Sequence, residues 1–407
     1  MPPSSSPAPS RLFFFDWVRI LAFFVLILYH VGMYYVSWDW HVKSASASAL
    51  LEPYMQLSAP WRLGLLFLVS GVASRFLLAK TGAARFLRQR SIRLLVPLLF
   101  GMLVIVPPQA YFEVVEKLAY SGDYADFMRL YLSGYRGFCR EDCLIMPTWN
   151  HLWFVAYLWV YTLVLGALAA IPGLRFDALG RRLAQLLTGW KIIVLPVALL
   201  ALARIILLPR FEQTHALVDD WYSHASYLSL FVLGALLGPI AAFWDRLVPL
   251  RWTSLATALS CWCLLNIWYA LPHDSMPASV HAPWSVVARA VYMLCAWSAI
   301  VAACGFARRH LEFDSRARRY LTEAVFPVYI LHQTLIVTLA HLLKPVKEDP
   351  VLEGLSLVVL TLTLSFGMFE VVRRVPLLRP LFGLARKAPS AAPHRTADAK
   401  TPAVAGA

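Results

Sequence analysis

The sequence predicts an all-α integral membrane protein with about ten transmembrane helices and both termini in the cytoplasm. Three observations lead to this class. The 407 residues are 59% hydrophobic and 15% charged, with a mean hydropathy of +0.62, which is too apolar for a soluble domain. Apolar runs long enough to cross a bilayer recur along most of the chain. Basic residues gather in alternate loops between these runs.

Each apolar run is close to the ~20 residues that an α-helix needs to cross the hydrocarbon core. Helices are expected throughout, because a segment in lipid must satisfy its own backbone hydrogen bonds. From the N-terminus, the ten predicted spans are residues 16–36, 60–79, 93–112, 150–171, 189–208, 224–243, 252–271, 284–304, 321–343 and 352–372.

The distribution of cations orients these helices. The loops after the second, fourth and eighth spans are basic, whereas residues 113–142, 211–221 and 344–349 have fewer cations or balance them with acids. The positive-inside rule therefore places both termini in the cytoplasm, in agreement with an even number of spans. The net charge of +14 mostly reflects this bias and an attraction to anionic lipid, so we expect the lipid bilayer as a partner and no nucleic acid.

Composition also divides the chain. Residues 1–10 are rich in Pro and Ser and are expected to be a disordered tail. Residues 11–375 form the predicted transmembrane domain, and residues 376–407 are expected to be a cytoplasmic, largely disordered tail. The longest predicted outer segment, 113–150, can cap a site on that face. No convincing internal repeat is present, which weighs against a transporter built from two similar halves.

The six cysteines fall into two groups. Four lie within predicted spans and are expected to be small packing residues. Cys139 and Cys143 lie in the predicted outer segment, where an oxidising periplasm allows a disulfide. The spacing leaves a disulfide and two free thiols about equally open. A metal site would need further ligands that this segment does not supply, so no metal is expected.

Arg19 and His30 lie on the first predicted helix. Their separation of eleven residues corresponds to about three turns, so both side chains share one face and lie roughly 16 Å apart along the axis. An imidazole at the bilayer midplane is costly and is therefore a candidate functional group. A neutral imidazole satisfied by a neighbouring helix is the simpler explanation. His332 lies at a similar depth in the ninth predicted span and favours a shared polar cavity instead.

Arg90 and Arg93 precede the third predicted span. Their i, i+3 spacing puts both guanidinium groups on one helix face, where they can bind a phosphate together. Ordinary positive-inside anchoring explains them equally well. Asp16 precedes Arg19 by one turn and can orient or neutralise it. Inner-face arginines roughly 16 Å from a midplane histidine match the shape of coenzyme A, with phosphates at one end and a reactive group at the other.

The pattern of these segments is similar to that of the membrane-bound acyltransferase 3 family. The resemblance covers residues 11 to about 343 and is closest to the glucan biosynthesis protein C branch. The segments that carry it are Phe15-Asp16-Trp17-Val18-Arg19 with His30, Tyr29-His30-Val31-Gly32, Leu68-Val69-Ser70-Gly71, Arg90-x-x-Arg93, His151-Leu152-Trp153-Phe154 and Pro327-Val328-Tyr329-Ile330-Leu331-His332-Gln333.

The resemblance implies an enzyme that moves an acyl group from cytosolic acyl-coenzyme A to a carbohydrate hydroxyl. The branch succinylates osmoregulated periplasmic glucans. His30 matches the family's essential histidine, and Arg19, Arg90 and Arg93 match its arginines near the donor. Ser70 and Gly71 match its Ser-Gly pair, and small residues at this point let helices approach closely around the donor's arm.

Four residues match the family less closely. His332 is a second catalytic candidate, and Asp16, His151 and Trp153 are candidates for substrate binding. His151 lies near the outer end of the fourth predicted span, where an acceptor sugar would arrive. Trp153 can stack on a sugar ring, although an aromatic belt at the membrane interface explains it equally well.

We therefore expect an acyl-coenzyme A-dependent O-acyltransferase in the bacterial inner membrane. The donor is succinyl- or acetyl-coenzyme A, no cofactor is tightly bound, and the acceptor is a glycan. His30 acts either as a general base or as a nucleophile that carries the acyl group. A second carboxylate on the donor can pair with Arg62, Arg204 or Arg289. A multi-span transporter of an anionic metabolite or sugar is the alternative function.

Overall fold

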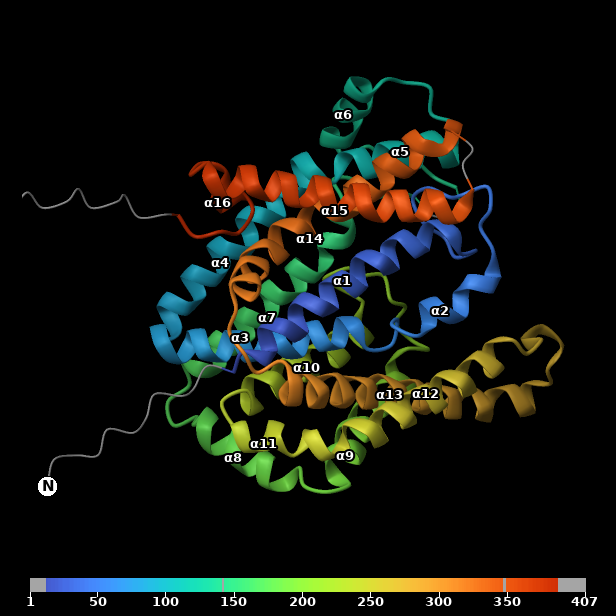
Figure 1. The fold of residues 1–407 in the computed structure, drawn as a ribbon. Helices are drawn as coiled ribbons and strands as arrows, with labels where there is room; N and C mark the ends of the chain where they lie inside the picture. Colours follow the sequence, from blue (N-terminus) through green and yellow to red (C-terminus); the bar gives the residue numbers. More distant parts are fainter. Residues whose placement is uncertain (1–11, 141–142, 347–348, 387–407) are drawn as a thin grey trace, which may run out of the picture.

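The computed structural model describes residues 12–140, 143–346 and 349–386, and these residues form an all-α protein (Figure 1). The predicted fold class is thereby confirmed. A helix covers each of the ten predicted apolar segments. These helices are α1 (Phe14–Tyr35), α3 (Arg62–Thr81), α4 (Ala83–Phe100), α7 (Trp153–Ala169), α9 (Lys191–Leu207), α10 (Trp221–Leu237), α12 (Leu247–Tyr269), α13 (Ala278–His310), α14 (Arg316–Leu343) and α15 (Pro350–Arg374).

Shorter helices connect them. The third predicted segment is not one straight helix, because α4 passes through a π-helical turn at Gly101–Ile105 before α5 begins at Pro107. Prolines at 97 and 107 each lack a backbone N–H, which favours such a break. The short helices are α2 (Glu52–Gln56), α5 (Pro107–Leu118), α6 (Tyr124–Ser133), α8 (Phe176–Leu186), α11 (Ala241–Asp245) and α16 (Leu378–Leu381).

Seven helical segments within the described residues are long and apolar enough to cross a membrane. An eighth is reached if α8 and α9, which meet at 109°, count as one broken span. The protein is therefore a multi-pass membrane protein, while the predicted total of ten spans stays a prediction. The seven are Phe14–Tyr35, Arg62–Thr81, Ala83–Leu118, Asn150–Ala169, Ala278–His310, Arg316–Val346 and Pro350–Arg374.

The helix α1 occupies the middle of the bundle, where it contacts α3, α13, α14 and α15 (Figure 1). The helices α3 and α10 approach each other closely. A Cβ atom on Gly71 would overlap the backbone oxygen of Phe231, and one on Gly234 would overlap the backbone of Leu68. Small residues at both positions allow the two backbones to touch, as is common between membrane helices.

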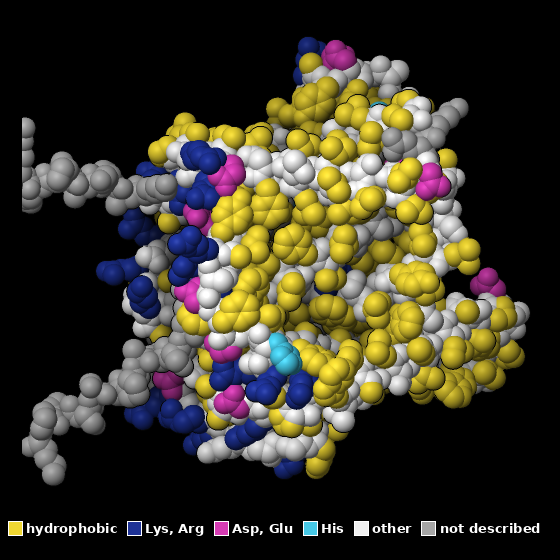
Figure 2. Space-filling model, viewed as in Figure 1, with side chains coloured by type: hydrophobic (Ala, Val, Ile, Leu, Met, Phe, Trp, Pro, Cys, Tyr) yellow, Lys and Arg dark blue, Asp and Glu magenta, His cyan; other side chains and the backbone are white. Residues whose placement is uncertain are grey.

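Lys and Arg side chains gather at one end of the molecule, on the left in Figure 2. We call this the basic end. Hydrophobic side chains cover most of the remaining visible face, as expected for a surface in contact with lipid. The exposed cations from the loops and helix ends that the sequence predicted to be cytoplasmic include Arg85, Arg88, Arg93, Arg181, Arg182, Arg309, Arg316, Arg319 and Arg374.

Part of the predicted C-terminal tail packs against the bundle. Residues 376–386 contain α16, which contacts α4 and α15, and they bury Phe382 and Leu384. The transmembrane unit thus continues about ten residues beyond the predicted boundary. The predicted disordered tail at 1–10 and the remainder of the C-terminal tail lie outside the described residues.

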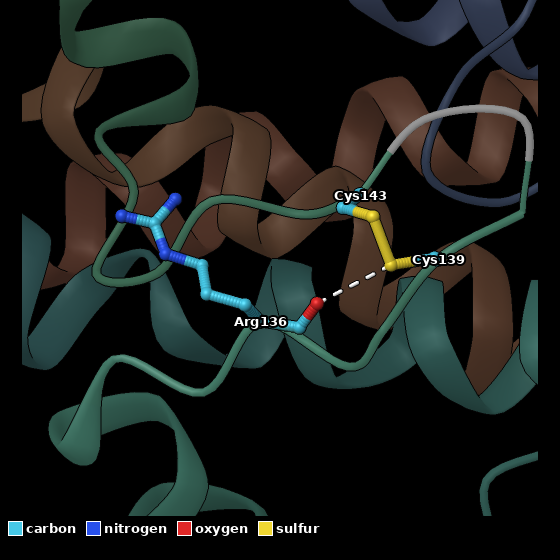
Figure 3. The surroundings of a disulfide bond; sticks show 3 residues. All are labelled: Arg136, Cys139 and Cys143. Carbon is cyan, nitrogen blue, oxygen red and sulfur yellow. Dashed lines mark hydrogen bonds between the residues drawn. A yellow bond between two sulfur atoms is a disulfide. The ribbon is translucent and has the colours of Figure 1, made fainter.

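The predicted outer segment contains a small domain of its own. Phe127, Tyr131 and Phe138 form an aromatic cluster apart from the main core. Cys139 and Cys143 are joined by a disulfide (Figure 3), which decides between the two alternatives left open by the sequence. The Cys139 sulfur lies 3.2 Å from the carbonyl oxygen of Arg136.

Candidate active site

A cavity with a volume of about 570 Å³ lies between α1, α3, α7 and α14. Residues from the loops 39–41, 148–151 and 213–215 also line it. Because the first of these loops follows the C-terminal end of α1, the cavity lies toward the end of the bundle opposite the basic end. His30, His151 and Trp153, which the sequence predicted as site residues, all line it.

His30 and His332 form a directly bonded pair. The Nδ1 atom of His30 lies 2.7 Å from Nε2 of His332, and the two rings stack with their centroids 4.9 Å apart. His332 is fully buried, whereas His30 lines the cavity. The residues are 302 positions apart in the chain, and α1 and α14 bring them together.

A backbone carbonyl determines the tautomers of this pair. Nδ1 of His332 lies 2.5 Å from the carbonyl oxygen of Tyr329, which can only accept a hydrogen bond. In the neutral ring, Nδ1 of His332 therefore carries the proton and Nε2 accepts from Nδ1–H of His30. This arrangement leaves Nε2 of His30 with a free lone pair, which is the state that a general base requires.

His151 lies behind the pair, edge-on to His332 with ring centroids 5.2 Å apart. Its Nε2–H donates to the carbonyl of Ile330 at 3.1 Å. The Tyr329 hydroxyl in turn donates to the carbonyl of His151. These bonds connect the short helix before α7 to residues 329 and 330 of α14, the part of the helix that orients His332. Any contact between His151 and a substrate would come in addition to this structural role.

A chain of polar side chains runs from the site toward the outer segment. Gln333 donates both to Oε1 of Gln109 and to Nε2 of His41, each at 3.0 Å. Nδ1–H of His41 donates to Glu113 at 2.5 Å. Sequence reasoning did not predict this chain of polar side chains. Gln109 and Gln333 were the available signal in the sequence. Both lie inside apolar segments, and a membrane helix buries a side-chain amide only where it has hydrogen-bond partners.

Among the described residues that line the cavity, Arg62 is the only Arg or Lys. Its side chain is 6% exposed, and its guanidinium carbon lies 3.3 Å above the centroid of the Tyr29 ring. Neither its Nε nor its Nη1 atom has a hydrogen-bond partner among the described residues. Arg204, by contrast, donates to the Tyr222 hydroxyl at 2.6 Å.

Aromatic rings form one wall of the cavity. The Trp153 indole stacks on the His215 ring at 4.1 Å, with an angle of 20° between the planes. Burial, with a smaller contribution from the charge of Arg62, lowers the pKa of His215 below its usual 6.5, although Asp220 opposes this shift. His215 is therefore neutral at pH 7. A neutral ring beside an indole provides a flat surface suited to a sugar face.

The arginines predicted near the donor lie at the basic end. Nη2 of Arg90 donates to Ser74 at 3.2 Å, and Arg90 is close enough to Arg19 and Arg93 to experience their charge. Arg93 is exposed. The three cations thus form one cluster, although they come from two helices. None of them lines the 570 Å³ cavity, and neither do Ser70 and Gly71.

Asp16 belongs to the basic end as well. Its carboxylate pairs with Arg318 and lies 3.7 Å from Nη2 of Arg19. Arg318 also binds Asp314, and this hydrogen bond lowers the pKa of the Asp314 carboxyl. Asp16 does not line the cavity. Its contacts link α1 to the start of α14, an arrangement that the sequence did not reveal because the partner lies 302 residues away.

Comparisons with known proteins support the resemblance drawn from the sequence. A family model described as an acyltransferase domain matches residues 12–370. "Glucans biosynthesis protein C" of Salmonella gallinarum is 25% identical over 390 residues, which cover 93% of this chain and 96% of the relative. The protein of the same name from Salmonella heidelberg shows the same identity and coverage. No solved structure matches.

Proposed function

The chain belongs to the acyltransferase family whose model covers residues 12–370, and on this basis we propose that it transfers an acyl group from cytosolic acyl-coenzyme A to a glycan hydroxyl. The protein is a multi-pass membrane acyltransferase, and the donor, the acceptor and the residue roles below are the proposal. The observation that carries it is the His30–His332 pair, which leaves one imidazole nitrogen with a free lone pair at the cavity wall.

The reaction is a direct transfer. Nε2 of His30 removes the proton from the acceptor hydroxyl while that oxygen attacks the thioester carbonyl carbon. The carbon–oxygen bond forms and the carbon–sulfur bond breaks. The coenzyme A thiolate leaves and takes the proton back from His30. No other reactant is needed. His332 is a positioning residue, because its hydrogen bond holds the His30 ring and strengthens when that ring is positively charged.

The donor approaches from the basic end. Arg19, Arg90 and Arg93 supply three guanidinium groups in one cluster, and such groups bind phosphate oxygens in pairs. We propose that they hold the coenzyme A phosphates. The distance of roughly 16 Å along α1 from Arg19 to His30 leaves room for an extended pantetheine arm. Gly71 permits the close contact of α3 with α10 beside this path.

The proposed acyl group is succinyl and the proposed acceptor is an osmoregulated periplasmic glucan. The relatives' name, which refers to glucan biosynthesis, supports the acceptor. The location of the cavity opposite the basic end supports acceptor entry from the periplasm, with the protein in the inner membrane. The aromatic wall formed by Trp153 and His215 suits a sugar ring.

Mass spectrometry of periplasmic glucans tests this proposal. Cells that lack the protein are complemented with the wild type, His30→Ala or His310→Ala, at equal membrane expression. His310 is exposed at the end of α13 and is the matched control. We expect the wild type and the control to add about 100 Da per succinyl group, and His30→Ala to add nothing. Equal modification by all three would remove His30 from the mechanism.

Labelled succinyl-coenzyme A distinguishes direct transfer from an acyl-enzyme. The purified protein is incubated with the donor alone and analysed by intact mass. Direct transfer predicts no labelled protein without an acceptor and rapid release of coenzyme A once glucan is added. A labelled protein that passes its label to glucan would instead show an acyl-enzyme, and loss of the label in His30→Ala would assign the nucleophilic role to His30.

A further inference from the structure

We propose that Arg62 binds the free carboxylate of the transferred acyl group, so that the enzyme selects a monothioester of a dicarboxylic acid over neutral acyl donors. This inference rests on the proposed acyltransferase function and identifies the residue that recognises the end of the acyl group distant from the thioester.

Arg62 is a buried cation with unused donors. Its side chain is 6% exposed, and both Nε and Nη1 are buried without hydrogen-bond partners among the described residues. Tyr29 supports one face of the guanidinium plane but accepts no hydrogen bond from it in the described structure. A guanidinium has five N–H donors, and leaving them unpaired away from water is costly. A ligand that accepts two of them relieves this cost.

The cavity does not supply a counterion for Arg62. Among the described residues that line it, Asp39 is the sole carboxylate. Asp39 is already paired with Lys117, whose Nζ lies 2.9 Å from its Oδ2. The cavity therefore has a positive charge that an anionic ligand can neutralise. A carboxylate matches the planar fork of a guanidinium and binds it through two parallel hydrogen bonds.

The other two arginines considered for this role differ in their contacts. Arg204 donates to Tyr222 at 2.6 Å and does not line the cavity, although its buried Nε also lacks a partner among the described residues. Arg289 does not line the cavity. Arg62 is thus the arginine of the three that both lines the cavity and retains free donors.

The location of Arg62 also fits the reaction. It is the first residue of α3, whose preceding residue Trp61 provides no side-chain cap. The positive end of this helix borders the cavity at Leu63 and adds to the attraction for an anion. The stacked Tyr29 is the neighbour of His30. Because Arg62 and His30 line the same cavity, a carboxylate held by Arg62 would keep the acyl chain in the cavity that contains the base.

Two donors of equal carbon number provide the test. Succinyl- and butyryl-coenzyme A differ only in the far end of the acyl chain, a carboxylate against a methyl group. The purified full-length protein in nanodiscs receives each donor together with unmodified periplasmic glucan, and kcat/KM is measured. We expect the wild type to favour succinyl. Arg62→Gln should lower succinyl transfer about 100-fold and change butyryl transfer less than threefold.

Two further variants make the result specific. Arg62→Lys retains the charge without the planar fork and should keep part of the succinyl preference. Arg210→Gln removes an exposed cation from the loop that contributes Gln213 and His215 to the cavity wall, and it should leave both donors unchanged. Elution as a single species and an unchanged Tm establish that each variant is folded.

The remaining outcomes separate this inference from the proposed function. An equal loss with both donors in Arg62→Gln would show that Arg62 acts on atoms common to all thioesters and would overturn the inference. A wild type that transfers butyryl as well as succinyl would overturn it too, while leaving the acyltransferase intact. A wild type that transfers neither group to glucan would contradict the proposed donor and acceptor themselves.

Discussion

At the scale of single residues, the state of His30 depends on a carbonyl that belongs to another helix. The carbonyl of Tyr329 selects the His332 tautomer, and His332 then selects that of His30. Metal-free catalytic histidines elsewhere are oriented by a carboxylate through the same nitrogen. Here a second neutral imidazole takes this place, which avoids a buried negative charge inside the membrane.

Variants of His332 test whether this residue acts by orienting the His30 ring. We expect His332→Leu to lower kcat about 100-fold with little change in KM, because the His30 ring loses its orientation while the cavity wall is unaltered. His332→Gln should recover part of this loss, since its side-chain oxygen can accept from Nδ1–H of His30. The measurement is acyl transfer to glucan at saturating donor. Equal activity of the Leu and Gln variants would contradict a positioning role.

His215 gives a prediction for pH. Burial lowers its pKa in the folded protein below the 6.5 of an exposed histidine. As the pH falls below 6.5, the unfolded chain therefore binds a proton that the folded protein resists, and the free energy of unfolding decreases. We expect the Tm to fall between pH 7 and pH 5, and to fall less in His215→Asn.

Asn is the replacement of choice at this position. His215 has a φ of +59°, and Asn adopts this left-handed conformation more readily than most residues. Identical pH dependence of Tm in the wild type and His215→Asn would show that another group causes the loss of stability.

At the scale of elements, the contact between α3 and α10 depends on glycines, which have no side chain to keep the two backbones apart. A Cβ on Gly71 would overlap the backbone oxygen of Phe231, and backbone atoms cannot move aside as a flexible side chain can. The contact sets the distance between two helices that flank the cavity, because α3 also carries Arg62 and α10 follows the loop with His215. A small change in the distance between α3 and α10 would therefore move both the Arg62 side and the His215 side of the cavity.

Replacing two helical glycines by Ala tests this contact. We expect Gly71→Ala to destabilise the folded protein by about 1–3 kcal/mol, because the added methyl group forces the helices apart. Gly367→Ala in α15 is the matched control, since a Cβ there meets nothing within 4 Å and Ala favours helix. Thermal unfolding in detergent measures both. A Gly71→Ala variant as stable as Gly367→Ala would show that the helices can separate without cost.

At the scale of the whole molecule, the basic end and the cavity lie at opposite ends. The exposed cations of the predicted cytoplasmic loops and the Arg19–Arg90–Arg93 cluster lie at the basic end, and the 570 Å³ cavity opens among loops beyond the far end of α1. This division suits a transfer across the membrane, in which donor and acceptor come from different compartments. The disulfide between Cys139 and Cys143, on the far side, fits an oxidising compartment there.

Cysteine labelling in intact cells tests this orientation. Ser46 and Ala84 are exposed, the first in the loop after α1 and the second at the basic end. In a background without the exposed Cys263, we expect a membrane-impermeant maleimide to label Ser46→Cys from outside and Ala84→Cys only after permeabilisation. The reverse pattern would invert the topology and with it the proposed direction of donor entry.

The sequence by itself determined the fold class and the helix locations, and it predicted a set of site residues. Hydropathy is a local property, so each apolar segment predicted its helix with small errors, apart from the break at Gly101–Ile105 and the packed residues 376–386. The shared face of Arg19 and His30 also follows from spacing on one helix. The family resemblance came from motifs that are local in the same sense, and the family comparison confirms it.

The tertiary structure alone decided which side chains meet. His332 contacts His30, Arg318 contacts Asp16, and Arg62 retains free donors in the cavity, although spacing in the chain does not distinguish Arg62 from Arg204. The physical reason is that a hydrogen bond requires two groups within about 3 Å, and partners 302 residues apart reach that distance only when several helices pack together.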